Sequence, residues 1–162
     1  MTIRPAFPDD MAAVNEIRNY FVRTSTAIYT EQETTLEERL EWLRDRDPVL
    51  HPVMVADDDG KVIGWASLSP YSEKCGYRST VEVSIYVMPQ CQGRGIGKAM
   101  MADLLEWARA AGAHCVIARI DSNGGPSIRL HESFGFTEAG RLREAGRKFD
   151  RWLTVIYMQK LL

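Results

Sequence analysis

The clearest structural signal in the sequence lies in Thr80-Val81-Glu82-Val83-Ser84-Ile85-Tyr86-Val87, continued by Met88-Pro89-Gln90-Cys91-Gln92-Gly93-Arg94-Gly95-Ile96-Gly97-Lys98. In its first part, aliphatic side chains alternate with Thr80, Glu82, Ser84 and Tyr86, which predicts a half-buried strand. Pro89 should end that strand, because proline cannot donate a sheet hydrogen bond. Glycines then occupy every second position before an apolar helical pattern begins. The stretch therefore predicts a strand, a tight loop and the first turn of a helix.

The glycine-rich loop suits an anion. Unpaired backbone N–H groups at a helix N-terminus commonly bind phosphate. The loop is not a Walker loop, because Lys98 is not followed by Ser or Thr. Glu82 lies five residues before Val87, about 17 Å along an extended strand. An acyl thioester anchored at the loop through an extended pantetheine arm could therefore place its carbonyl near Glu82.

Composition bounds the class of protein. The length of 162 residues favours a single domain over residues 1–162. The net charge of −2 gives no reason to expect a nucleic-acid or membrane partner. Its three cysteines fit no metal motif and indicate a reduced, cytoplasmic compartment. The three histidines form no ligand pattern, so no metal is expected. Basic residues gather between 141 and 151, either as a solvated face or as a contact for substrate or phosphate.

The hydrophobic pattern of the whole chain predicts one mixed sheet. Helices are expected at 11–21, 36–47, 99–111 and 127–133, and strands at 3–5, 51–56, 61–68, 80–87, 114–120, 136–142 and 151–158. The last two strands should be joined by a loop through Gly146 and Asp150. We therefore predict an α/β (α+β) fold with about seven mostly antiparallel strands and helices on both faces. Residues 24–29 form either a plain connection or a wall of a substrate cleft.

Several separated motifs resemble one superfamily along essentially the whole chain. The segment Gln92-Gly93-Arg94-Gly95-Ile96-Gly97 resembles the acetyl-CoA motif of the GCN5-related N-acetyltransferases. A narrower resemblance is to the phosphinothricin and methionine sulfoximine N-acetyltransferases. It rests on 80–87, Thr24-Ser25-Thr26-Ala27, Ser127-Ile128-Arg129-Leu130-His131-Glu132, Gly135-Phe136, and Gly146-Arg147-Lys148-Phe149 with Trp152. This resemblance implies the GNAT-like acyl-CoA fold and a homodimer.

The resemblance also implies how acetyl-CoA, the co-substrate, is held. The pyrophosphate would lie on the backbone N–H groups of the loop, and the pantetheine arm would add to the end of the preceding strand. Relatives usually carry a CoA-contacting Asn where this chain has Gly124, and Asn123 is the candidate replacement. The implied cofactor-binding residues are Ile85, Tyr86, Val87, Gln92, Gly93, Arg94, Gly95, Ile96, Gly97, Lys98 and Asn123.

Two residues match catalytic positions of the family. Glu82 corresponds to a proposed general base that removes a proton from the substrate ammonium; the alternative is a structural glutamate on a half-exposed sheet face. His131 would donate a proton to the leaving thiolate or to the developing oxyanion. Its alternative is an ordinary hydrogen bond on a helix face.

The substrate implied by the resemblance is a small zwitterion with a primary amine. Its carboxylate needs a cation, and its side chain needs an apolar wall. The candidate substrate-binding residues are Tyr29, Lys74, Arg78, Val83, Ser84, Lys148 and Phe149. The function expected is direct acetyl transfer in a ternary complex, with a peptide or protein amine acetyltransferase or a non-catalytic CoA-binding module as alternatives. Relatives commonly have an Arg-centred loop where this chain has Ser72-Glu73-Lys74.

Overall fold

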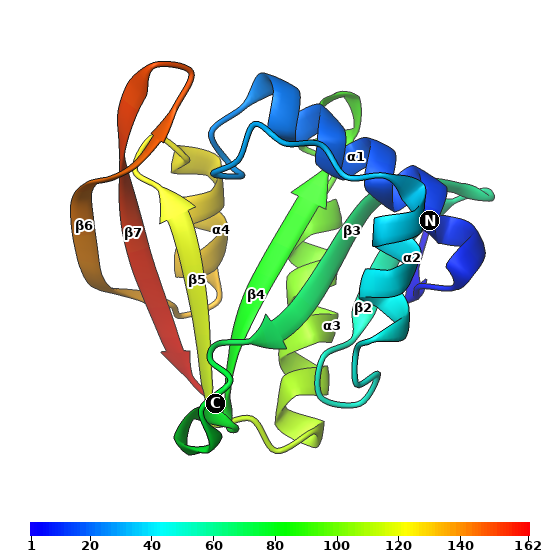
Figure 1. Ribbon diagram of the computed structural model, residues 1–162. Coiled ribbons are helices and arrows are strands. Elements are labelled where there is room, and N and C mark those ends of the chain that lie inside the picture. Colours follow the sequence, from blue (N-terminus) through cyan, green and yellow to red (C-terminus); the bar gives the residue numbers. More distant parts are fainter.

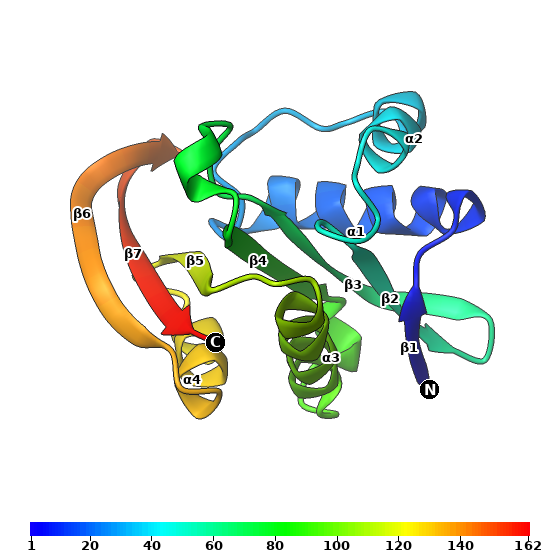
Figure 2. The ribbon, with the colours of Figure 1, turned by 90° about the horizontal axis from the view of Figure 1, so that it is seen from below.

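One seven-stranded sheet separates two layers of helices in the computed structural model, which describes residues 1–162 (Figures 1 and 2). Helices α1 and α2 cover one face, and α3 and α4 cover the other. The strands are β1 (Thr2–Pro5), β2 (Val53–Asp58), β3 (Lys61–Pro70), β4 (Thr80–Val87), β5 (Cys115–Asp121), β6 (Thr137–Lys148) and β7 (Arg151–Leu161). The helices are α1 (Met11–Thr24), α2 (Leu36–Arg44), α3 (Ile96–Ala110) and α4 (Gly125–Ser133), with short 3₁₀ turns at Pro8–Asp10, Cys75–Tyr77 and Pro89–Cys91.

The sheet order is β1-β2-β3-β4-β5-β7-β6, and every neighbouring pair is antiparallel except β4 and β5. The predicted mixed, mostly antiparallel sheet with helices on both faces is confirmed. Element boundaries differ by a few residues. Helix α3, for example, begins at Ile96 and includes the third glycine of the loop in its first turn. No helix combines the length and the apolar composition needed to cross a membrane.

The alternation along β4 sorts its side chains as the sequence predicts. Val81 and Val83 are buried with the core that α3 and α4 cover. The predicted apolar stripe of α3 is fully or almost fully buried there, and burial of a Leu or Met side chain stabilises the fold by about 1.5–3 kcal/mol. A smaller core, which includes Trp65, lies under α1 and α2. Glu82 and Ser84 therefore point away from the main core, toward the second layer.

The connection between β6 and β7 differs from the expected loop. Strand β6 continues past Gly146 to Lys148, and the chain reverses at Phe149 and Asp150, which have φ values of 51° and 57°. An irregularity between Leu142 and Gly146 interrupts the pairing before it resumes. Positive φ at a two-residue hairpin turn usually selects Gly or Asn. Phe149 lacks that signal, so the predicted strand ended at residue 142, whereas β6 continues to Lys148.

The two parallel strands diverge after three paired positions. Strands β4 and β5 pair from Thr80–Cys115 to Glu82–Ile117 and then separate, as Figure 1 shows. On its other edge, β4 stays paired with β3 as far as Val87. The β4 edge from residue 83 onward therefore has backbone groups free to pair with an added strand. This opening runs from Glu82 toward the N-terminus of α3.

Candidate active site

The glycine loop forms an open cradle of amide groups. Gly93 and Gly95 have φ values of 77° and 81°, a conformation that glycine adopts without steric cost. The N–H of Ala99 is the first in α3 to donate to a backbone carbonyl, that of Gly95, at 3.0 Å. The amides before it lack intrahelical acceptors because they lie in the first turn. Together with the helix dipole they make a site for an anion.

Side chains of the loop fix it to neighbouring elements. The Gln92 Nε2 group donates to the Val87 carbonyl at 3.0 Å, which ties the loop to the end of β4. The Arg94 Nη2 group pairs with Asp58 Oδ2 at 2.9 Å on the β2–β3 hairpin. A Cβ at position 97 would lie 3.3 Å from a Leu130 methyl group of α4. The residues predicted for pyrophosphate binding therefore offer their backbone, while two of their side chains hold the loop in place.

The three predicted pantetheine residues lie along the free edge of β4. The Tyr86 ring packs against Phe21 and Trp65, with centroids 5.5 Å and 4.9 Å away, so its side chain does not enter the opening. Asn123 lies in the turn after β5, where its N–H and Nδ2 both donate to Asp121 Oδ1, at 2.8 Å and 3.2 Å. The amide of Asn123 is thus engaged within the protein. The opening and the loop together fit a molecule with a pyrophosphate and a long amide-bearing arm.

Glu82 lies where β4 leaves β5, beside a polar cavity of about 410 Å³. Its Oε1 accepts a hydrogen bond of 2.7 Å from Nε of Arg119, which projects from β5. This bond to a carboxylate raises the pKa of Arg119 above its usual value. The cavity is lined by Pro70, Tyr71, Ser72, Lys74, Tyr77, Glu82, Arg119 and Tyr157.

The structure divides the predicted substrate residues. Lys74 lines the cavity with Glu82, whereas Arg78 and Ser84 do not. Val83 is 4% exposed and belongs to the core, so its side chain does not face the cavity. The sequence reasoning missed Arg119 and the three tyrosines. A signal for Arg119 existed, because it is the one charged residue in the otherwise apolar run from Cys115 to Ile120.

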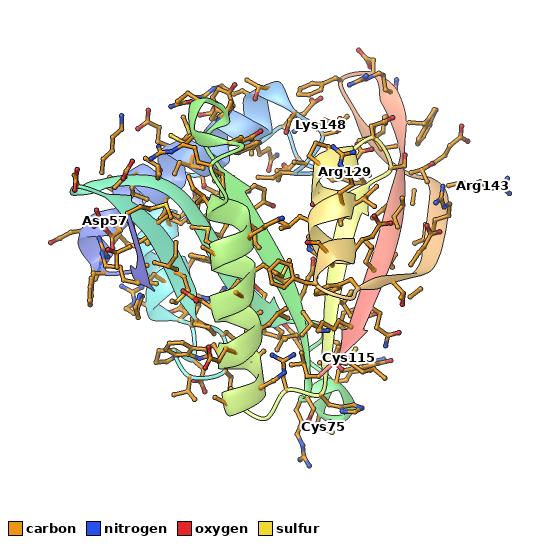
Figure 3. The ribbon with its side chains drawn as sticks, turned by 180° about the vertical axis from the view of Figure 1, so that it is seen from behind. Asp57, Cys75, Cys115, Arg129, Arg143 and Lys148 are labelled. Atoms are coloured by element: carbon orange, nitrogen blue, oxygen red, sulfur yellow. The ribbon has the colours of Figure 1, made fainter.

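Lys148 has a different position from the one predicted for a substrate contact. Lys148, labelled in Figure 3, is 2% exposed. Its Nζ donates to the carbonyls of Ser25 and Ile28 at 2.6 Å and 2.7 Å. Burial lowers the pKa of this amino group. Phe149 adds a backbone N–H bond of 2.8 Å to Glu31 Oε1. Lys148 thus fastens the segment after α1 to the β6–β7 hairpin.

Tyr29 packs on the same hairpin. A Cβ at position 146 would lie 2.6 Å from Cδ2 of its ring, so the contact requires Gly146. Burial raises the pKa of Tyr29 to about 12. Its hydroxyl therefore stays protonated at neutral pH and donates to the Thr154 carbonyl at 3.3 Å. Residues 25–31 are therefore fixed to the β6–β7 hairpin by these contacts and are more than a plain connection.

Replacement of Lys148 by Met should lower the free energy of unfolding by about 3 kcal/mol, because two carbonyls lose a charged donor in a buried place. Urea denaturation measures this change. Lys61→Met removes an exposed lysine from the start of β3 and is the matched control. An equal effect of the two substitutions would show that Lys148 does not hold the segment.

His131 is buried in α4 with one ring nitrogen occupied. Its side chain is 5% exposed, and Nδ1 lies 2.8 Å from the Ser127 carbonyl. A carbonyl only accepts, so Nδ1 carries the proton and the neutral ring has a bare Nε2. Burial lowers the pKa of His131, which favours that neutral form. Donation to a thiolate would first require protonation of Nε2, and His131 does not line the cavity around Glu82.

The depressed pKa of His131 makes stability depend on pH. As pH falls through about 6.5, the unfolded chain takes up a proton at this residue while the folded chain does not, so folding stability is lost. His131→Gln keeps an N–H donor and does not titrate. The stability difference between wild type and this variant should therefore shift against wild type between pH 7.5 and pH 5. Urea titrations at both pH values measure it; a constant difference would contradict it.

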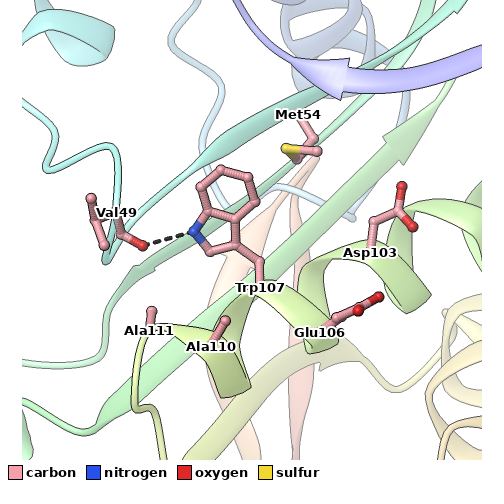
Figure 4. Close-up of a pocket in the computed structure, with 7 residues that line it drawn as sticks. All are labelled: Val49, Met54, Asp103, Glu106, Trp107, Ala110 and Ala111. Carbon is pink, nitrogen blue, oxygen red and sulfur yellow. Dashed lines mark hydrogen bonds between the residues drawn. The ribbon is translucent and has the colours of Figure 1, made fainter.

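A second cavity, of about 510 Å³, lies on the α3 face of the sheet. Its lining is mostly apolar, and the Trp107 Nε1 group donates across it to the Val49 carbonyl at 2.8 Å (Figure 4). The carboxylates of Asp103 and Glu106 lie at its edge, without a cation or nucleophile beside them. This cavity offers no group for acyl transfer, so the candidate active site is the one at Glu82.

Comparisons with known proteins agree with this geometry. Residues 14–136 match the model of the Acetyltransferase (GNAT) family. An L-methionine sulfoximine/L-methionine sulfone acetyltransferase of Salmonella typhimurium is 40% identical over 98% of this chain and 93% of its own. A phosphinothricin N-acetyltransferase of Streptomyces viridochromogenes is 40% identical over 98% and 86% of the two chains.

Two solved structures are similar over the whole chain. An acetyltransferase of Salmonella typhimurium, solved with its cofactor acetyl-CoA, has a TM-score of 0.97 and 40% identity and covers 100% of this chain and 94% of its own. A ribosomal-protein-alanine N-acetyltransferase of Brucella melitensis has a TM-score of 0.97 and 41% identity, with both chains fully covered. The glycine cradle, the parted strands and these similarities show that the chain belongs to the GNAT acetyltransferase family.

Proposed function

We propose that this enzyme transfers the acetyl group of acetyl-CoA to the primary amine of a small amino-acid-like substrate, of the methionine sulfoximine or phosphinothricin type. The observation that carries the proposal is the position of Glu82. This carboxylate lies at the point where β4 and β5 part, in a polar cavity that is also lined by the cationic side chains of Lys74 and Arg119. The names of relatives that are 40% identical support the substrate class.

Acetyl-CoA supplies an activated thioester carbonyl. The amides from Gly93 to Lys98 hold its pyrophosphate, and the free edge of β4 from Val83 to Val87 pairs with its arm. Glu82 removes a proton from the substrate ammonium, directly or through water, because only the neutral amine can attack. The attack is direct, within a ternary complex: the C–N bond forms, the thioester C–S bond breaks, and CoA leaves as a thiolate that takes up the remaining amine proton through solvent. Cys91 and Cys115 are buried, so neither serves as a nucleophile at the cavity.

A second candidate function is acetylation of a peptide or protein amine, which the name of one similar structure suggests. The cavity at Glu82 favours the smaller substrate. Tyr71 and Tyr77 form an edge-to-face pair, 5.3 Å between centroids, on its wall. A non-catalytic CoA-binding module would need no carboxylate there.

The three free cysteines support a reducing cytoplasm as the compartment, and the homodimer stays a prediction.

An assay of CoA release over a panel of amines tests the function. The panel contains methionine sulfoximine, methionine sulfone, phosphinothricin and a short peptide with a free N-terminus. We expect turnover with at least one of the amino-acid analogues and little with the peptide. Faster turnover of the peptide would overturn the small-substrate assignment. Acetyl-CoA binding without any turnover would favour the binding module instead.

A further inference from the structure

We propose that Arg119 receives the α-carboxylate of the substrate and so restricts the enzyme to free amino acids over simple amines. This inference rests on the proposed function and adds to it a specificity-determining residue. Nε of Arg119 donates to Glu82 Oε1 at 2.7 Å, and the hydroxyl of Tyr157, the cross-strand neighbour of Arg119 on β7, also interacts with the guanidinium.

The Arg119 guanidinium is bound to Glu82 through Nε and is exposed at its terminal nitrogens. Glu82 is the one carboxylate of the chain that pairs with Arg119, and the Arg119 side chain is 54% exposed on the wall of the polar cavity. An arginine presents its terminal nitrogens as a fork that matches the two oxygens of a carboxylate. Glu82 therefore orients Arg119 through Nε, and the exposed end of the guanidinium remains available to the carboxylate of a substrate.

The spacing of an α-amino acid suits this pair. Its nitrogen and carboxyl carbon are both bonded to Cα and lie about 2.5 Å apart. Glu82 and Arg119 are themselves in contact, at 2.7 Å. A substrate whose ammonium reaches Glu82 therefore brings its carboxylate within reach of Arg119. An amine without that carboxylate would satisfy Glu82 alone.

The charge of the cavity points the same way. Glu82 contributes one negative charge, and Arg119 and Lys74 contribute two positive charges to the same lining. A zwitterion pairs its ammonium with Glu82 and its carboxylate with Arg119. Lys74 then remains for a polar or acidic group at the end of the substrate side chain. A simple cationic amine would bring no anion for Lys74 or for the terminal nitrogens of Arg119.

The test compares two substrates that differ only in the carboxylate. They are L-methionine sulfone and 3-(methylsulfonyl)propan-1-amine, which has the same side chain and a primary amine. The kcat/KM for each is measured by CoA release with wild type, Arg119→Gln and Arg119→Lys. Loss of the Arg119 charge also alters the surroundings of Glu82, which affects both substrates alike. The ratio of the two kcat/KM values is therefore the readout.

We expect wild type to prefer the amino acid. Arg119→Gln should reduce that preference by about 10- to 100-fold, the effect of losing a hydrogen-bonded charge pair. Arg119→Lys should recover part of it, because a lysine keeps the charge without the fork. The acetyl-CoA affinity should stay within about twofold of wild type in both variants, since the loop amides that hold it are untouched.

Failure of this inference is distinguishable from failure of the proposed function. If wild type acetylates methionine sulfone and Arg119→Gln keeps the full preference for it, the role of Arg119 is wrong and the function stands. The same holds if wild type acetylates both substrates equally well. If wild type binds acetyl-CoA but acetylates neither compound, the proposed function fails and the inference fails with it.

Discussion

Glu82→Gln should lower kcat at neutral pH by about 10²- to 10⁴-fold, the contribution expected of a positioned general base. The amide has the shape of the carboxylate but cannot accept the proton of the substrate ammonium. Acetyl-CoA affinity should be almost unchanged, because the loop amides that we propose to hold the pyrophosphate begin at Gly93, beyond the far end of β4. CoA release measures kcat, and isothermal titration calorimetry measures the affinity.

The control for this variant is Glu138→Gln. Glu138 also pairs with an arginine, with its Oε2 2.7 Å from Arg141 Nη2, but it lies on β6 outside the cavity. It should leave kcat unchanged. The deficit of Glu82→Gln should also shrink as pH rises, because the substrate amine loses its proton to solvent near its own pKa. Undiminished turnover by Glu82→Gln at pH 7 would rule out the general base.

Gly95→Asp should weaken acetyl-CoA binding by about 100-fold. Its carboxylate would stand among the free amides before α3, where it competes for them and repels a pyrophosphate. Aspartate tolerates the positive φ of 81° better than most residues, and no atom lies within 4 Å of the added Cβ. The fold should therefore survive, and calorimetry at low and moderate salt measures the affinity, with a smaller loss at the higher salt.

Gly112→Asp is the matched control, because Gly112 has the same φ of 81° and the same open surroundings. It lies just beyond the opposite end of α3, where no anion site is proposed. Acetyl-CoA affinity should stay near that of wild type. Equal losses in the two variants would mean that backbone strain, and not charge at the cradle, accounts for the change.

The local parts of the fold and of the site could be predicted from sequence because their signals are local. The period of two in Thr80–Val87 identifies a strand and separates its buried side chains from Glu82. The alternating glycines identify the loop, since the positive φ values at Gly93 and Gly95 need that residue. The turn at Phe149 and Asp150 escaped prediction because its residues lack the usual turn chemistry.

Non-local pairings decided the rest. Only the tertiary structure shows where β4 and β5 part, because the register of a parallel pair depends on how the intervening helix packs. It also brings Arg119 to Glu82 across 37 residues and Lys148 to the carbonyls of Ser25 and Ile28 across 123 and 120 residues.

Local residue patterns were therefore enough to identify the strand Thr80–Val87, the glycine loop and the carboxylate of Glu82. Only the folded chain shows that Lys148 has a structural role and that Arg119 lines the cavity. Residue type sets the local backbone preference and the direction of a side chain. The partners of that side chain depend on contacts between segments far apart in the chain.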